Sequence, residues 1–233
     1  MVAIFGIVLQ SGAQNSIPAK WNSEKIRGER FKPYVYYDGE AFYTTEWCSG
    51  SITLSSGEVL DSLSMKYSSF EDDLIYFNNV LNASIKIDKE QLNGFTMIEK
   101  NGTKHLFRKQ PSPRNPEKIL FFEELYKGET DLLCYRRVEL TTTSPYFTAG
   151  GIQKNQKYTP TYIYYFYNPQ KGFCTVRPKR ASLFAQFGKE EKKQVRKHLR
   201  KEHIVIIDET SFSYAWASLE KAGFVPLFRS EEE

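Results

Sequence analysis

Hydrophobic and polar positions alternate from Trp47 to Phe77, and polar turns interrupt the alternation twice. Ile52 and Leu54 alternate with Ser51 and Thr53 ahead of a Ser-Ser-Gly turn, and a second apolar series follows that turn. A two-residue period broken by Gly-bearing turns is typical of half-buried antiparallel strands. This stretch therefore predicts a three-stranded β-meander.

The same period predicts further strands on both sides of this unit. Phe31–Tyr37 ends at Asp38-Gly39, and 40–47 is the expected hairpin partner, with Pro33 confining the first strand to an edge. Asn101-Gly102 is the strongest hairpin signal in the chain. The other predicted strands are 83–87, 94–99, 104–108, 131–140, 161–167 and 173–176.

Two segments between these strands are harder to assign. Residues 118–126 have an apolar run that fits either a strand or one short helix. Residues 141–157 are rich in Thr, Gly and polar side chains, and this composition predicts a long mobile loop.

The pattern changes to a helical one from Arg177 onwards. Helices are predicted over 181–187 and 190–203, and a third begins after Asp208 and stops at Gly223. Strands followed by helices indicate an α+β fold: a large antiparallel β-meander or partly closed barrel, followed by two to three C-terminal helices. We expect one domain, in which a β-rich body (15–176) carries a packed helical tail (177–233).

Residues 1–14 resemble a secretory signal peptide, which would be removed on export. They are uncharged, with an apolar run from Val2 to Leu9 and then small residues at Ser11 and Ala13, but they lack a basic start. A buried first strand is the alternative. Without such a leader being processed, the protein would be cytoplasmic; with it, the periplasm or the extracellular space is expected. The sequence has no run of 18 apolar residues, so it predicts no membrane-spanning helix.

Cys48, Cys134 and Cys174 are widely spaced, and none forms a metal-ligand motif. Each lies in a predicted strand, so we interpret them as small buried side chains. One disulfide with a thiol left over is the alternative. The sequence predicts neither a metal nor a cofactor.

Three local patterns are similar to those of a known group of proteins. They are a strand Trp followed by the turn 54–57, the stretch FFEELYKGETDLL at 121–133, and the tail YYFYNPQKGFCTVRPKRASLFAQFGKEEKKQVRKHL. Together they resemble uncharacterised secreted β-rich proteins of Bacteroidetes-type bacteria. That resemblance implies export and a β-rich fold, and it implies no activity.

The clearest functional candidate is a concentration of positive charge between Arg177 and His203. This segment has ten Lys or Arg and three Glu, whereas the whole chain carries a formal net charge of only +4. A basic helix over 189–203 could bind nucleic acid or lipid headgroups, although most charged faces are merely solvated. The candidate anion-binding residues are Arg177, Lys179, Arg180, Lys192, Lys193, Arg196, Lys197, Arg200 and Lys201.

Other chemistry is weakly indicated. The aromatic strand Tyr162–Tyr167 could stack on sugars or bases, but a strand with two apolar faces is more often core, here covered by the helix that carries Trp216. A hydrolase would need His105, an acid and Cys134 in one deep pocket. The sequence therefore favours a non-catalytic exported module that binds a protein or envelope component, with anionic partners and a scattered hydrolase site as alternatives. Export would disfavour nucleic acid.

Overall fold

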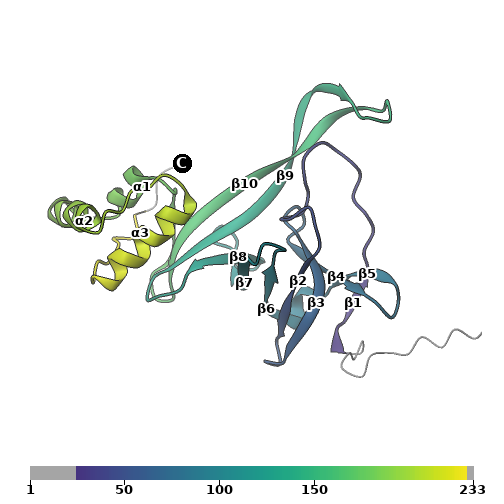
Figure 1. The fold of residues 1–233 in the computed structure, drawn as a ribbon, viewed down its shortest axis with the longest axis horizontal. Coiled ribbons are helices and arrows are strands. Elements are labelled where there is room, and N and C mark those ends of the chain that lie inside the picture. The colour runs from purple at the N-terminus through teal and green to yellow at the C-terminus, as the bar shows by residue number, and fades with distance from the viewer. Residues whose placement is uncertain (1–24, 230–233) are drawn as a thin grey trace, which may run out of the picture.

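The computed structural model describes residues 25–229, and the predicted leader lies outside them. Within these residues a single sheet of eleven antiparallel strands is followed by helices (Figure 1). The strands are β1 (Gly28–Arg30), β2 (Cys48–Leu54), β3 (Val59–Ser68), β4 (Asp73–Asn78), β5 (Ala83–Ile87), β6 (Leu92–Ile98), β7 (Lys104–Pro111), β8 (Ile119–Tyr126), β9 (Asp131–Phe147), β10 (Gln153–Asn168) and β11 (Gly172–Val176).

Two meanders diverge from the centre of this sheet. The strand order is β1-β5-β4-β3-β2-β6-β7-β8-β9-β10-β11, so β2 to β5 run towards one edge and β6 to β11 towards the other. A short 3-10 helix (Lys89–Gln91) leads the chain back from β5 to β6. The sheet is not closed, because β1 and β11 are its two edges. The predicted α+β meander is confirmed in its open form.

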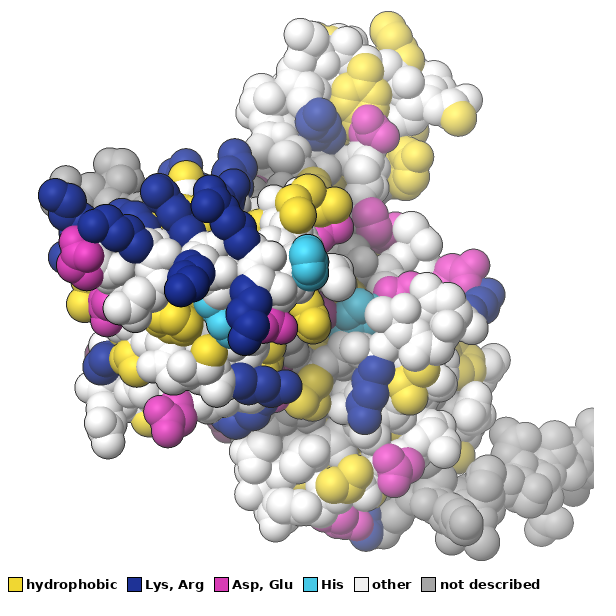
Figure 2. All heavy atoms as spheres, turned by 60° about the vertical axis from the view of Figure 1, so that its left-hand side comes forward, with side chains coloured by type: hydrophobic (Ala, Val, Ile, Leu, Met, Phe, Trp, Pro, Cys, Tyr) yellow, Lys and Arg dark blue, Asp and Glu magenta, His cyan; other side chains and the backbone are white. Residues whose placement is uncertain are grey.

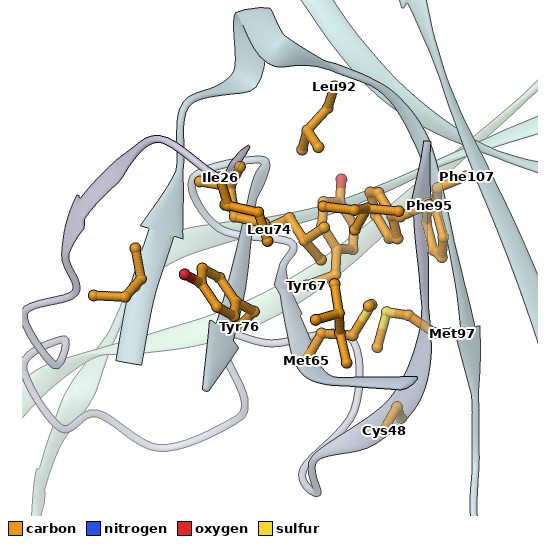
Figure 3. Close-up of a cluster of buried hydrophobic side chains, with 14 of the residues drawn as sticks. Ile26, Cys48, Met65, Tyr67, Leu74, Tyr76, Leu92, Phe95, Met97 and Phe107 are labelled. Carbon is orange, nitrogen blue, oxygen red and sulfur yellow. The ribbon is translucent and has the colours of Figure 1, made fainter. Parts of the chain in front are cut away.

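The first hydrophobic core lies on β2 to β8 (Figure 3). Phe95 and Phe107 stack with ring centroids 4.7 Å apart, and the fully buried Tyr67 lies 4.8 Å from Phe107. Met65 and Met97 point towards each other below these rings. Strand alternation brings these side chains to one face, as the pattern between 47 and 77 predicts.

The second core joins the far end of the sheet to the helices α1 (Arg180–Ala185), α2 (Lys189–Lys201) and α3 (Glu209–Lys221). Trp216 packs on Phe166 of β10 with ring centroids 4.4 Å apart, and its indole Nε1 donates to the Thr130 carbonyl at 2.9 Å. Asp208 caps α3 by accepting a hydrogen bond from the Ser211 backbone N–H. The predicted last helix and its covering of the aromatic strand are both confirmed.

The predicted hairpin over 31–47 is wrong. These residues contain only two isolated bridges, Asp38–Lys157 and Phe42–Ser68. Pro33 removes a ladder donor, and the aromatic rings are used in packing instead. Tyr34 packs edge-on against Phe70, and the Tyr158 hydroxyl donates to the Val35 carbonyl at 2.9 Å.

The predicted mobile loop over 141–157 is also wrong. Strand β9 continues to Phe147 and β10 begins at Gln153, so most of the segment is a paired hairpin that projects from the sheet (Figure 1). Its threonines are β-branched residues that favour strands, and the Thr141 and Thr159 hydroxyls are 2.6 Å apart across the ladder. The ambiguous segment 118–126 is a strand, β8.

Candidate functional site

Three arginines of the helical tail converge on one groove. Arg180 at the start of α1 and Arg196 and Arg200 on α2 line a cavity of about 420 Å³. The remaining lining residues are Leu199, His203, Ile204, Val205 and Ile206. We call this cavity the basic groove; its lining combines cations with aliphatic side chains and contains no acidic residue.

The sequence of α2 explains why its arginines are available. Only Val195 and Leu199 of this helix are buried, so a thin apolar edge docks the helix and leaves its flanks exposed. The guanidinium groups of Arg180 and Arg196 lie 5.1 and 5.2 Å from the centroid of the Phe184 ring. Such cation–π contacts hold the two arginines in place without neutralising their charge.

Within residues 25–229, none of the three groove arginines has a carboxylate partner. Their charges are therefore free to meet an external anion. A second cavity of about 430 Å³, on the other side of the sheet, differs in this respect. It is lined by three basic residues (Arg114, Lys118 and Arg137) and three acidic ones (Glu71, Asp72 and Glu139), so it has no preference of charge.

His203 occupies an unusual backbone position in the groove wall. It follows the end of α2 with φ +54°, a left-handed conformation that normally favours glycine. The Ile204 N–H donates to the Leu199 carbonyl at 2.8 Å and closes the helix end. From His203 to Ile207, exposed side chains alternate with the half-buried Ile204 and Ile206, which pack on the second core.

Most of the basic residues predicted from the sequence lie on the same end of the molecule. Figure 2 shows Lys and Arg side chains gathered over the helices. Of the nine, only Arg180, Arg196 and Arg200 line the groove. Lys193 pairs with Glu190 at 3.1 Å, and Lys192 is half-buried. The others, all exposed, are Arg177, Lys179, Lys197 and Lys201.

Sequence reasoning missed the aliphatic wall and His203. The run Ile204–Ile207 follows the basic helix directly, but nothing in it indicates which side chains face the arginines. All four residues are apolar, so their alternation of exposure becomes apparent only in the structure.

A separate network of charged side chains crosses the sheet between the two cores. His105 Nε2 lies 2.8 Å from a Glu99 oxygen, and His105 Nδ1 lies 2.7 Å from Glu123. Arg136 donates from Nε to Glu123 and forms a bidentate pair with Glu209 at 2.6 and 2.7 Å. Because Glu209 is the first residue of α3, this network ties the helical tail to the strands β7, β8 and β9.

The network shifts the pKa of both of its central groups in the direction that favours the charged form. Hydrogen bonds to Glu123 and Glu99 raise the pKa of His105, although burial opposes this. Burial raises the pKa of Glu123, but its bonds to His105 and Arg136 outweigh burial and hold that pKa below its usual range. The Tyr43 hydroxyl, 3.0 Å from His105 Nδ1, completes the cluster.

His105 and Cys134, the two candidate hydrolase residues, both lie beside Glu123 in this cluster. Cys134 faces Glu123 across the β8–β9 ladder, but it is fully buried, and burial raises the pKa of its thiol. Both nitrogens of His105 are engaged with carboxylates, so neither is directed at the thiol as a base. Neither residue lines the two cavities described above. Cys48, Cys134 and Cys174 are all buried, and none of the three is in a disulfide.

Two negative findings apply to residues 25–229. No cluster of three or more His, Cys, Asp or Glu side chains is arranged to hold a metal ion. Of the helices in this part of the chain, none has the length and apolarity needed to cross a bilayer.

Comparison with family models, with curated proteins and with solved structures found no match to this chain. What can be inferred about function therefore comes from its own residues.

Proposed function

We propose that this protein is a non-catalytic binding module and that it holds an anionic, phosphate-bearing partner in the basic groove. The observation that carries the proposal is the convergence of Arg180, Arg196 and Arg200 from two helices on one cavity with no acidic residue in its wall. Exposed arginines scattered over a solvated helix would not share a cavity.

Phosphate groups fit this arrangement better than isolated carboxylates. A guanidinium group presents a planar fork of donors that matches the oxygens of phosphate, and hydrogen bonds to charged groups each contribute about 1.5–3 kcal/mol. Three such forks around one cavity of about 420 Å³ could surround a single phosphate group. The aliphatic wall formed by Leu199 and Ile204 would contact the apolar part of the same partner.

We place the module outside the cytoplasm, in the periplasm or at the cell envelope. This location rests on the signal-peptide pattern of residues 1–14 and on the resemblance to secreted β-rich proteins. Export would bring the groove to lipid headgroups or to a protein or other component of the envelope, and away from nucleic acid. An intact-mass measurement of the native protein would detect removal of the leader.

The test of the groove is a charge-matched pair of triple variants. The first is Arg180→Gln/Arg196→Gln/Arg200→Gln. The control, Lys104→Gln/Lys118→Gln/Lys157→Gln, removes the same charge from exposed positions on or beside the strands of the sheet. Each is eluted from immobilised heparin with a salt gradient and titrated calorimetrically with inositol hexakisphosphate.

We expect the groove variant to elute at clearly lower salt and to lose inositol hexakisphosphate binding, whereas the control stays close to the unmodified protein. Equal losses in both variants would mean that only net charge matters, and the groove would then have no special role.

A further inference from the structure

We infer that the partner of the basic groove is the surface of an anionic lipid bilayer, and that Val205 and Ile207 insert into it. This inference rests on the proposed function, since it names the partner of the same groove. Val205 lines the groove, and the two side chains are 71% and 80% exposed.

The alternation along 203–207 is the first observation that supports a membrane. Ile204 and Ile206 pack on the second core, so the segment is held to the body of the protein while its odd-numbered side chains face outward. Exposing aliphatic side chains to this extent is unfavourable in water, and removing them from water would lower the free energy. A β-branched pair fixed beside a cavity is instead suited to enter an apolar phase.

The second observation is charge complementarity. The arginines that share the groove with Val205 have no carboxylate partner in the described part of the chain. The rest of α2 adds exposed cations such as Lys197 and Lys201, and Figure 2 shows hydrophobic side chains among the basic ones over the helices. Cations beside exposed apolar side chains are the combination that binds anionic headgroups and the upper acyl region together.

Nucleic acid fits the groove less well. Single-stranded nucleic acid is held by cations together with aromatic side chains on which bases stack. Apart from His203 and the three arginines, the wall of this groove is aliphatic: Leu199, Ile204, Val205 and Ile206. The Phe184 ring, which contacts Arg180 and Arg196, is buried and therefore offers no stacking surface.

The experiment is co-sedimentation of the full chain with two kinds of vesicle, phosphatidylcholine alone and phosphatidylcholine mixed with phosphatidylglycerol. The decisive variant is Val205→Ser/Ile207→Ser, which keeps every charge. The control is Val59→Ser/Leu81→Ser, which replaces an aliphatic side chain of β3 and one of the β4–β5 turn that are 51% and 60% exposed. Both pairs are at the surface, so each variant is expected to fold.

We expect binding to the mixed vesicles and not to phosphatidylcholine alone, and a weakening with rising salt. The Val205→Ser/Ile207→Ser variant should bind the mixed vesicles about tenfold more weakly, because two apolar insertions are lost. Its retention on heparin should not change, and the control variant should bind like the unmodified protein.

Three results would overturn the membrane inference while leaving the groove intact. They are vesicle binding unaffected by Val205→Ser/Ile207→Ser, equal binding to both kinds of vesicle, and binding to a single-stranded oligonucleotide without binding to vesicles. Failure of the groove itself has a different signature, since the triple arginine variant would then stay on heparin as firmly as its charge-matched control.

Discussion

Replacing Arg136 by methionine should destabilise this protein severely. The Arg136 side chain is only 5% exposed and lies between Glu123, also 5% exposed, and Glu209, 30% exposed. Its guanidinium also lies 4.7 Å from the centroid of the Tyr162 ring. Methionine fills much of the same volume, so the change removes the charge more than the packing.

The size of the loss follows from what the arginine leaves behind. Removing one partner of a buried ion pair costs about 3–5 kcal/mol, because the remaining charge stays buried without compensation. Glu123 keeps its bond to His105, and water can reach Glu209, so the low end of that range applies here. We therefore expect a loss of about 3 kcal/mol in the free energy of unfolding. With a urea dependence of 2–3 kcal/mol/M, the midpoint would fall by about 1 M.

Urea denaturation followed by far-ultraviolet circular dichroism measures this loss, and the neighbouring Arg137→Met is the matched control. Arg137 pairs with Glu139 at 2.7 Å, but both side chains are well exposed, so its loss should cost no more than about 1 kcal/mol. Adding Glu123→Gln to Arg136→Met should restore part of the stability, because no buried charge is then left unpaired. A loss from Arg136→Met no larger than that of Arg137→Met would refute the reasoning.

Two further predictions concern the histidines. Because the pKa of His105 is raised in the folded protein, its contribution to stability is complete below its ordinary pKa of 6.5 and is lost as pH rises through the higher folded pKa. The pKa of Glu123 is lowered, so its contribution to stability is complete above its ordinary pKa of 4.5 and is lost as pH falls through the lower folded pKa. Stability should therefore decline as pH rises above 6.5, and His105→Gln should flatten that decline. An unchanged profile of stability against pH would contradict this. His203→Gly should stabilise the protein by up to about 1 kcal/mol and so raise its thermal midpoint, since a φ of +54° suits glycine. The same change should weaken the binding of inositol hexakisphosphate, because His203 lines the groove. A less stable variant would mean that the His203 side chain holds the segment in place.

Much of this fold could be predicted from the sequence because its strands are half-buried. The alternation over 47–77, the Asn101-Gly102 turn and the Asp208 cap are local signals, and each predicts its element correctly. The two errors arose where tertiary contacts decide. The aromatic rings of 31–47 pack on the sheet without joining it, and the threonines of 141–147 pair with β10 despite their polar composition.

For the candidate site, the sequence predicts the excess of positive charge but not the arrangement of the side chains that carry it. Ten basic residues between 177 and 203 indicate a cationic surface, but the meeting of Arg180 with Arg196 and Arg200 depends on how α1 and α2 pack. The charged network around Glu123 and Arg136 could not be predicted for a similar reason, since its members come from different strands and from α3. Adjacent acids on a strand point to opposite faces, as Glu123 and Glu124 do: the first bonds to Arg136 and the second pairs with Arg108 at 3.1 Å.

The two polar features of the molecule are connected through a short piece of chain. Glu209 comes two residues after Ile207, so the bidentate bond to Arg136 fixes the end of the segment that carries the proposed membrane contacts. At its other end this segment is held by the closure of α2, where Ile204 donates to Leu199. A rigid segment loses little conformational entropy when its side chains are ordered in a complex. Loosening the Arg136–Glu209 pair should therefore weaken vesicle binding although no residue of the groove is changed.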